Sequence, residues 1–141
     1  MKIHENYINR CIEIAKNGLG TTFPNPMVGC VIVHENIIIG EGFTSPFGGN
    51  HAEVNAIRSV TNKELLKKST LYVTLEPCNM CAGALFWSQI GRVVFGAADE
   101  KRGFMIQGKH MLHPKTKLEF GVLHNECSAL VSDFFNAIRM K

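Results

Sequence analysis

The sequence predicts one α/β domain with a mixed sheet and helices on both of its faces. Three observations support this fold class. The length of 141 residues is that of one domain of ordinary size, and we treat residues 1–141 as one unit. Hydrophobic residues make up 45% of the chain and charged residues 19%, which is a globular composition. Strand-like and helix-like segments alternate after an opening hairpin, as they do in layered α/β folds.

The first half of the chain is expected to hold a helix, a hairpin and a second helix. Apolar residues recur at helical spacing over residues 3–15 and are followed by glycines. The apolar runs 27–33 and 37–43 have the length of strands, and the turn residues 35–36 between them predict a hairpin. A loop rich in Gly, Pro and Ser follows, and a helix then begins at His51.

The second half continues the alternation and then becomes irregular. Its strand candidates are short and apolar, and its final helix has apolar residues four positions apart. In order, we expect a strand over 70–75, a helix over 78–87, a strand over 92–96, an irregular segment over 97–116, an edge strand over 118–122 and a helix over 126–138.

Charge and cysteine content exclude several classes of protein. A net charge of +3 permits an anionic partner such as RNA but does not require one. Five cysteines, an odd number, argue against a secreted disulfide scaffold. The N-terminus has no apolar signal core, and no apolar run approaches the roughly 20 residues that span a bilayer. We therefore expect a cytoplasmic protein with no membrane partner.

Two short motifs carry the chemistry, His51-Ala52-Glu53 and Pro77-Cys78-Asn79-Met80-Cys81. A Cys-x-x-Cys at a helix start places both thiols on one turn, where free N–H groups and the helix dipole favour thiolates. His51 can bring one imidazole nitrogen to the same point. Because one nitrogen and two sulfurs suit zinc, we predict one zinc ion per chain, bound by His51, Cys78 and Cys81 with a fourth position open to water.

Glu53 is the candidate for proton transfer. On a regular helix it would point about 200° away from His51, which makes it a poor ligand for the same metal. At a helix start it can still line the cavity, where a carboxylate beside a zinc-bound water serves as general acid and base. Two alternatives stay open: a redox Cys-x-x-Cys pair, and a closed structural zinc site completed by His110 or His113.

His-x-Glu combined with Pro-Cys-x-x-Cys is the motif pair of zinc-dependent nucleobase deaminases. Through it the chain resembles the cytidine-deaminase-like superfamily over nearly its whole length. The resemblance implies a three-layer α/β/α sandwich around a mixed five-stranded sheet. It also implies a homodimer whose interface lies near the segment after the second cysteine, where Phe86 and Trp87 suit such a contact.

Within this superfamily the two halves resemble different enzymes. The second half resembles bacterial tRNA-specific adenosine deaminase, over residues 70–85, 88–97, Asp99, 113–114, 121–123, 126–130 and 133–135. The first half resembles the pyrimidine deaminase domain of riboflavin biosynthesis, over residues 17–20, 24–33 and 51–57. Natural divergence and a hybrid of two enzymes are both consistent with this mixture.

Each resemblance has departures. The riboflavin enzyme carries a longer insertion between its two cysteines and often a reductase domain, which we do not expect in a sequence of 141 residues. The adenosine deaminase usually has an asparagine near Thr44, and its final helix ends in a dense arginine cluster. Here that helix ends with the sparser segment 136–141.

The sequence therefore predicts a hydrolytic deaminase that replaces an amino group on a nucleobase with a carbonyl and releases ammonia. Conversion of adenosine to inosine in tRNA is the main hypothesis. Deamination of a free base, nucleoside or nucleotide, of the riboflavin-pathway pyrimidine, guanine or cytosine type, is the alternative. A catalytically silent zinc-stabilised binding module is a third. The expected substrate-contacting residues are Asn25, Thr44, Ala52, Pro77 and Asp99.

Overall fold

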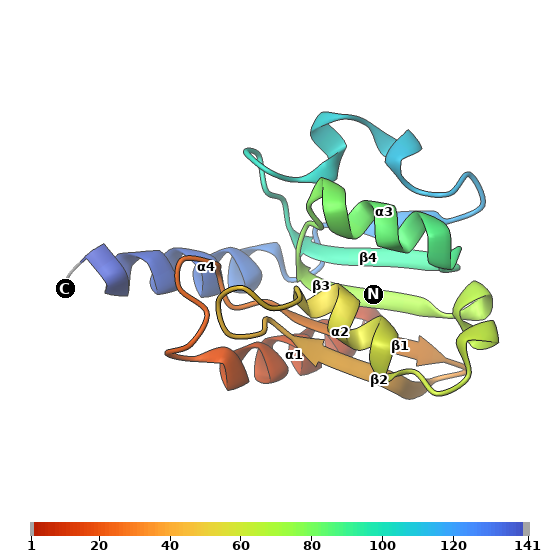
Figure 1. Ribbon diagram of the computed structural model, residues 1–141, viewed down its shortest axis with the longest axis horizontal. Helices are drawn as coiled ribbons and strands as arrows, with labels where there is room; N and C mark the ends of the chain where they lie inside the picture. Colours follow the sequence, from red (N-terminus) through yellow and green to blue (C-terminus); the bar gives the residue numbers. More distant parts are fainter. Residues whose placement is uncertain (1, 140–141) are drawn as a thin grey trace.

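The computed structural model describes residues 2–139 and contains a single five-stranded sheet of order β2-β1-β3-β4-β5 (Figure 1). The strands are β1 (Gly29–His34), β2 (Ile37–Phe43), β3 (Thr70–Leu75), β4 (Arg92–Ala97) and β5 (Lys117–Phe120). The helices are α1 (Lys2–Ala15), α2 (Ala52–Ser59), α3 (Asn79–Ser88) and α4 (His124–Arg139). Residues 140–141 of the C-terminal segment lie outside the described residues.

The sheet is mixed, as the sequence predicts. β1 pairs antiparallel with β2 on one side and with β3 on the other. β3, β4 and β5 run parallel to one another. Glu35 and Asn36, which connect β1 to β2, both have positive φ, as the tight turn of a two-residue hairpin requires.

Helices cover both faces of the sheet, which confirms the three-layer sandwich. Because side chains alternate along a strand, Cys30 and Ile32 of β1 face the core beneath α2 and α3. Val31 and Val33 face the opposite core beneath α1 and α4. In Figure 1, α4 projects past the end of the sheet, and Cys127 in its first turns is the one residue of the described helix that is buried.

A glycine lets α2 lie directly against β2. A Cβ atom at Gly42 would lie 2.5 Å from the carbonyl oxygen of Ala52 and 2.5 Å from the backbone nitrogen of Ala56. The first turn of α2, which follows His51, is therefore held against the sheet by backbone contact. This contact fixes where the His51 and Glu53 side chains emerge.

The structure differs from the sequence prediction mainly at element ends. β1 begins at Gly29 rather than at residue 27, because the backbone of Val28 pairs with Thr44 outside the sheet. The connector after α2 contains a 3-10 helix over Lys63–Lys68, and the irregular segment contains two more, Phe104–Ile106 and Lys109–Met111. Among residues 2–139, no helix is both long and apolar enough to span a bilayer.

Candidate active site

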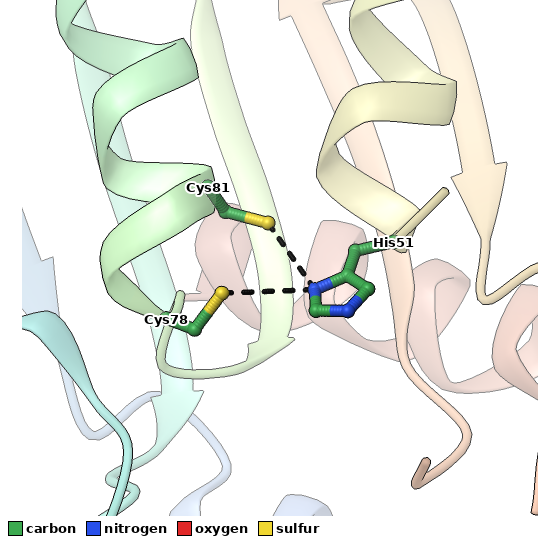
Figure 2. Close-up of side chains that lie close together, drawn as sticks. All are labelled: His51, Cys78 and Cys81. Atoms are coloured by element: carbon green, nitrogen blue, oxygen red, sulfur yellow. Dashed lines mark hydrogen bonds between the residues drawn. The ribbon is translucent and has the colours of Figure 1, made fainter. Parts of the chain in front are cut away.

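The two chemical motifs meet where α2 and α3 begin. His51 occupies the position just before α2, and Cys78 occupies the position just before α3. Both helices lie on the same face of the sheet, so their N-terminal ends open onto one place. In Figure 2 the Nδ1 atom of His51 points toward the sulfurs of Cys78 and Cys81.

The spacing of these three side chains fits a tetrahedral zinc ion. His51 Nδ1 lies 3.7 Å from Cys78 Sγ and 3.4 Å from Cys81 Sγ. Ligand bonds of about 2.05 Å to nitrogen and 2.3 Å to sulfur, at a tetrahedral angle, separate the two donor atoms by about 3.6 Å. All three donor atoms lie within 4.8 Å of one another. The residues present can therefore hold zinc without rearrangement.

Three protein ligands leave the fourth coordination position of a tetrahedral zinc ion open. Within residues 2–139, the group of possible metal ligands comprises His51, Cys78 and Cys81 alone. The ring of His113 instead packs against Phe86, and its Nδ1 accepts the backbone N–H of Lys115. Three ligands and an open position are typical of catalytic rather than structural zinc sites.

The surroundings of the two thiols favour a thiolate at the metal position. Hydrogen bonding from the Cys81 thiol, aided by backbone N–H groups at the start of α3, lowers the pKa of Cys78 to about 5. The same interaction and burial raise the pKa of Cys81. In the absence of metal, Cys78 is therefore the residue that carries the negative charge, and Cys81 loses its proton when a cation binds.

Glu53 shares a cavity with the metal ligands. Its side chain is 4% exposed, and burial raises its pKa to about 7. A divalent cation beside it would favour the carboxylate form. The 200° rotation expected from helix geometry does not apply, because His51 has an extended backbone (φ −71°, ψ 165°) and precedes the helix. Glu53 and His51 therefore line the same cavity.

The cavity next to these residues has a volume of about 80 Å³. Three of the five expected substrate residues, Asn25, Thr44 and Asp99, line it; Ala52 and Pro77 are buried and are not among its lining residues. The Thr44 hydroxyl is already engaged, since it donates to the carbonyl of Pro26 and accepts the N–H of Val28. The lining residues are Asn25, Pro26, Val28, Thr44, His51, Glu53, Leu75, Glu76, Cys78, Asp99 and Arg102.

Glu76 is a buried carboxylate that the sequence analysis did not single out. Its Oε1 accepts the N–H of Asp99 at 3.0 Å, and its Oε2 accepts the N–H of Met105 at 2.9 Å. The side chain is therefore the anchor of the loop over residues 99–105. Glu76 could have been predicted as a site residue from its position in the sequence, because it lies between β3 and Pro77 and directly precedes the Pro-Cys-x-x-Cys motif.

Arg102 is a second lining residue that sequence reasoning missed. It lies on the same loop, and its backbone N–H donates to Oδ1 of Asp99 at 3.0 Å. The N–H of Lys101 donates to the same oxygen at 3.1 Å. No local pattern marks Arg102, because only the folded loop brings it back to the cavity.

The fold and the site together define a class: an α/β/α domain with a His-Cys-Cys zinc site and a buried carboxylate beside it. Residues 1–97 match the family described as the cytidine and deoxycytidylate deaminase zinc-binding region, and the chain belongs to that family. The sequence is 42% identical to a diaminohydroxyphosphoribosylamino-pyrimidine deaminase of Buchnera aphidicola, over 96% of this chain and 94% of the relative.

Solved structures give the same picture of the fold. A diaminohydroxyphosphoribosylaminopyrimidine deaminase/5-amino-6-(5-phosphoribosylamino)uracil reductase of Thermotoga maritima matches with a TM-score of 0.84 and 35% identity. This match covers 99% of the present chain but only 42% of the Thermotoga protein. A tRNA:A34 deaminase matches with a TM-score of 0.73 and 24% identity, over 89% of this chain and 98% of that one, which shows a shared fold.

Proposed function

We propose that residues 1–141 form one deaminase domain that acts on the diaminohydroxy-phosphoribosylamino-pyrimidine of riboflavin biosynthesis. The observation that carries this proposal is the 42% identity to a deaminase of that name over nearly the whole of both chains. The site is compatible with it, since a cavity lined by His51, Glu53 and Cys78 lies at the metal position.

The proposed roles follow from the geometry. His51, Cys78 and Cys81 hold zinc, which supplies a Lewis acid that lowers the pKa of water toward neutrality. The Glu53 carboxylate accepts a proton from the attacking water and delivers it to a ring nitrogen. The oxygen bonds to the ring carbon that bears the amino group, the carbon–nitrogen bond then breaks, and ammonia leaves with a proton that Glu53 relays. Asn25 and Asp99 orient the ring within the cavity.

Ammonia release from a substrate panel tests this proposal. The panel contains the phosphoribosylamino-pyrimidine, cytosine, guanine and a tRNA bearing adenosine at the wobble position. We expect turnover of the first compound, and a loss of about 10²–10⁴-fold in Glu53→Gln with zinc content unchanged. Turnover of another panel member, with the pyrimidine inert, would refute the substrate assignment.

The same substrate panel also tests the two other hypotheses drawn from the sequence, the tRNA adenosine deaminase and the silent binding module. The tRNA adenosine hypothesis has support from the second half of the sequence and from a fold likeness at 24% identity. Exclusive turnover of tRNA would restore it. A silent binding module would bind zinc stoichiometrically and release no ammonia from any compound.

We also propose a homodimer formed through the outer face of α3. Trp87 is 82% exposed and Met80, two helical turns earlier on the same face, is 65% exposed. Size-exclusion chromatography with light scattering should give a molecular mass twice that of one chain. The Trp87→Lys variant should instead give the mass of a single chain. Leu19→Lys, at an exposed site away from α3, is the control. A dimer unaffected by Trp87→Lys would place the interface elsewhere.

A further inference from the structure

Asn25 lies at the cavity on the loop that precedes β1, and its side chain is free to meet a ligand. It lines the cavity at the metal position. Its amide group makes no hydrogen bond with the part of the chain that the structure describes, so its donors and its acceptor are available to a ring. An amide orients a ring only if the backbone that carries it keeps its place. The contacts that hold this loop therefore bear on how a substrate is oriented.

Thr22 closes the turn over residues 22–25 from both ends. The Thr22 hydroxyl donates to the carbonyl oxygen of Asn25 at 2.8 Å, and the N–H of Asn25 donates to the carbonyl oxygen of Thr22 at 2.8 Å. Thr22 is 0% exposed, so water does not compete for its hydroxyl. If the turn opened, this buried hydroxyl would lose its partner at a cost in free energy. The side chain of Thr22 therefore keeps the turn closed.

Apolar packing does not hold the tip of this turn. Phe23 is 58% exposed, and Pro24 beside it is exposed as well. Thr22, in contrast, is inserted against the segment that follows α1, since a Cβ atom at Gly18 would lie 2.9 Å from its Cγ2 atom. The methyl group of Thr22 thus fixes one end of the turn to the domain, while its hydroxyl fixes the other end at Asn25.

A second buried threonine holds the residues that follow Asn25. Thr44 is 4% exposed, and its hydroxyl donates to the carbonyl of Pro26 at 3.1 Å and accepts the N–H of Val28 at 3.0 Å. The segment 25–28 is therefore tied by Thr22 at its start and by Thr44 along the rest of its length. With both ties in place, the Asn25 side chain is the part of this segment that remains free.

We propose that Thr22 is a positioning residue, which holds Asn25 in the orientation that its amide needs to contact the reacting ring. This inference rests on the proposed function, in which Asn25 orients the ring. Thr22 is not among the residues that line the cavity, so its effect on the substrate passes through Asn25. A contact made alike in the ground state and in the transition state lowers KM and leaves kcat nearly unchanged. Loss of the Thr22 hydroxyl should therefore act mainly on KM.

The kinetic test compares three variants of the zinc-loaded protein. Thr22→Val removes the hydroxyl and should raise KM for the phosphoribosylamino-pyrimidine about 3- to 10-fold, with zinc content unchanged. Thr22→Ser retains the hydroxyl and should keep KM within about 2-fold of wild type. Thr21→Val is the matched control, because Thr21 is exposed and its hydroxyl donates to the carbonyl of Gly18 rather than to Asn25. Equal KM values in Thr22→Val and Thr21→Val would overturn the proposal.

Amide hydrogen exchange, measured by NMR, separates failure of this inference from failure of the proposed function, because it requires no turnover. The N–H of Asn25 donates to the carbonyl of Thr22, so its exchange rate reports whether the turn is closed. This rate should rise about 10-fold in Thr22→Val and stay at the wild-type value in Thr22→Ser and Thr21→Val.

Faster exchange at Asn25 in Thr22→Val would support the hold on this residue even if the pyrimidine is not deaminated. Exchange at the wild-type rate would overturn the proposal whatever the substrate is. If Thr22→Val does not fold, Thr22→Ala removes the hydroxyl without placing a second methyl group against the Asn25 carbonyl, and it replaces the valine variant in both experiments.

Discussion

Replacement of Glu76 should destabilise the domain far more than replacement of an ordinary surface carboxylate. The side chain is 6% exposed, and its two oxygens accept backbone N–H groups of Asp99 and Met105. A hydrogen bond to a charged group contributes about 1.5–3 kcal/mol, so Glu76→Ala should cost about 3–6 kcal/mol. Glu76→Gln keeps one acceptor oxygen and turns an NH₂ group toward the other N–H, so we expect a cost of about 1.5–3 kcal/mol.

Urea unfolding of the zinc-loaded protein, followed by circular dichroism, measures these costs. Glu64→Gln is the matched control, because Glu64 is exposed and its replacement should change the free energy of unfolding by less than about 0.5 kcal/mol. Because the anchored loop carries Asp99 and Arg102, kcat/KM should fall in Glu76→Gln as well. A Glu76→Gln protein as stable as the control would show that the carboxylate does not hold the loop.

Three further predictions concern the metal, the packing of α2 and a buried hydrogen bond. Free zinc at 100 times its Kd should stabilise the apo protein by about 2.7 kcal/mol in a thermal melt, and an unchanged melt would contradict the His-Cys-Cys site. Gly42→Ala should cost about 1–3 kcal/mol in urea unfolding, since its Cβ would lie 2.5 Å from the Ala52 carbonyl oxygen; a neutral effect would mean that α2 shifts freely. Tyr72→Phe should cost about 0.5–1.5 kcal/mol, since it removes the 2.6 Å hydrogen bond between the Tyr72 hydroxyl and Nδ1 of His4, and stability equal to wild type would argue against that bond.

Sequence patterns predicted the fold closely where the periodicity is strong. The predicted strands 37–43 and 70–75 match β2 and β3 without displacement, because apolar runs of strand length bounded by turn residues admit few alternatives. The short 3-10 helices in the irregular segment could not be predicted, since three-residue elements leave no periodic trace. Their positions depend on contacts such as that between Glu76 and Met105.

The candidate site likewise contains residues that the sequence predicts and residues that it does not. The three metal ligands and Glu53 lie in short motifs at helix starts, so they could be predicted from the spacing of residues in the sequence. Arg102 and Glu76 reach the cavity only through the loop after β4, whose path is decided by backbone hydrogen bonds rather than by a residue pattern. Expectations for the substrate drew on resemblance, and the comparisons favour the alternative hypothesis over the tRNA one.

The position of β3 in the sheet bears on how the metal site is assembled. β3 is the strand at which the antiparallel part of the sheet meets the parallel part. His51 comes before this strand in the chain, and Cys78 and Cys81 come after it. The two parts of the sheet must therefore pair through β3 before the chain presents a complete set of zinc ligands.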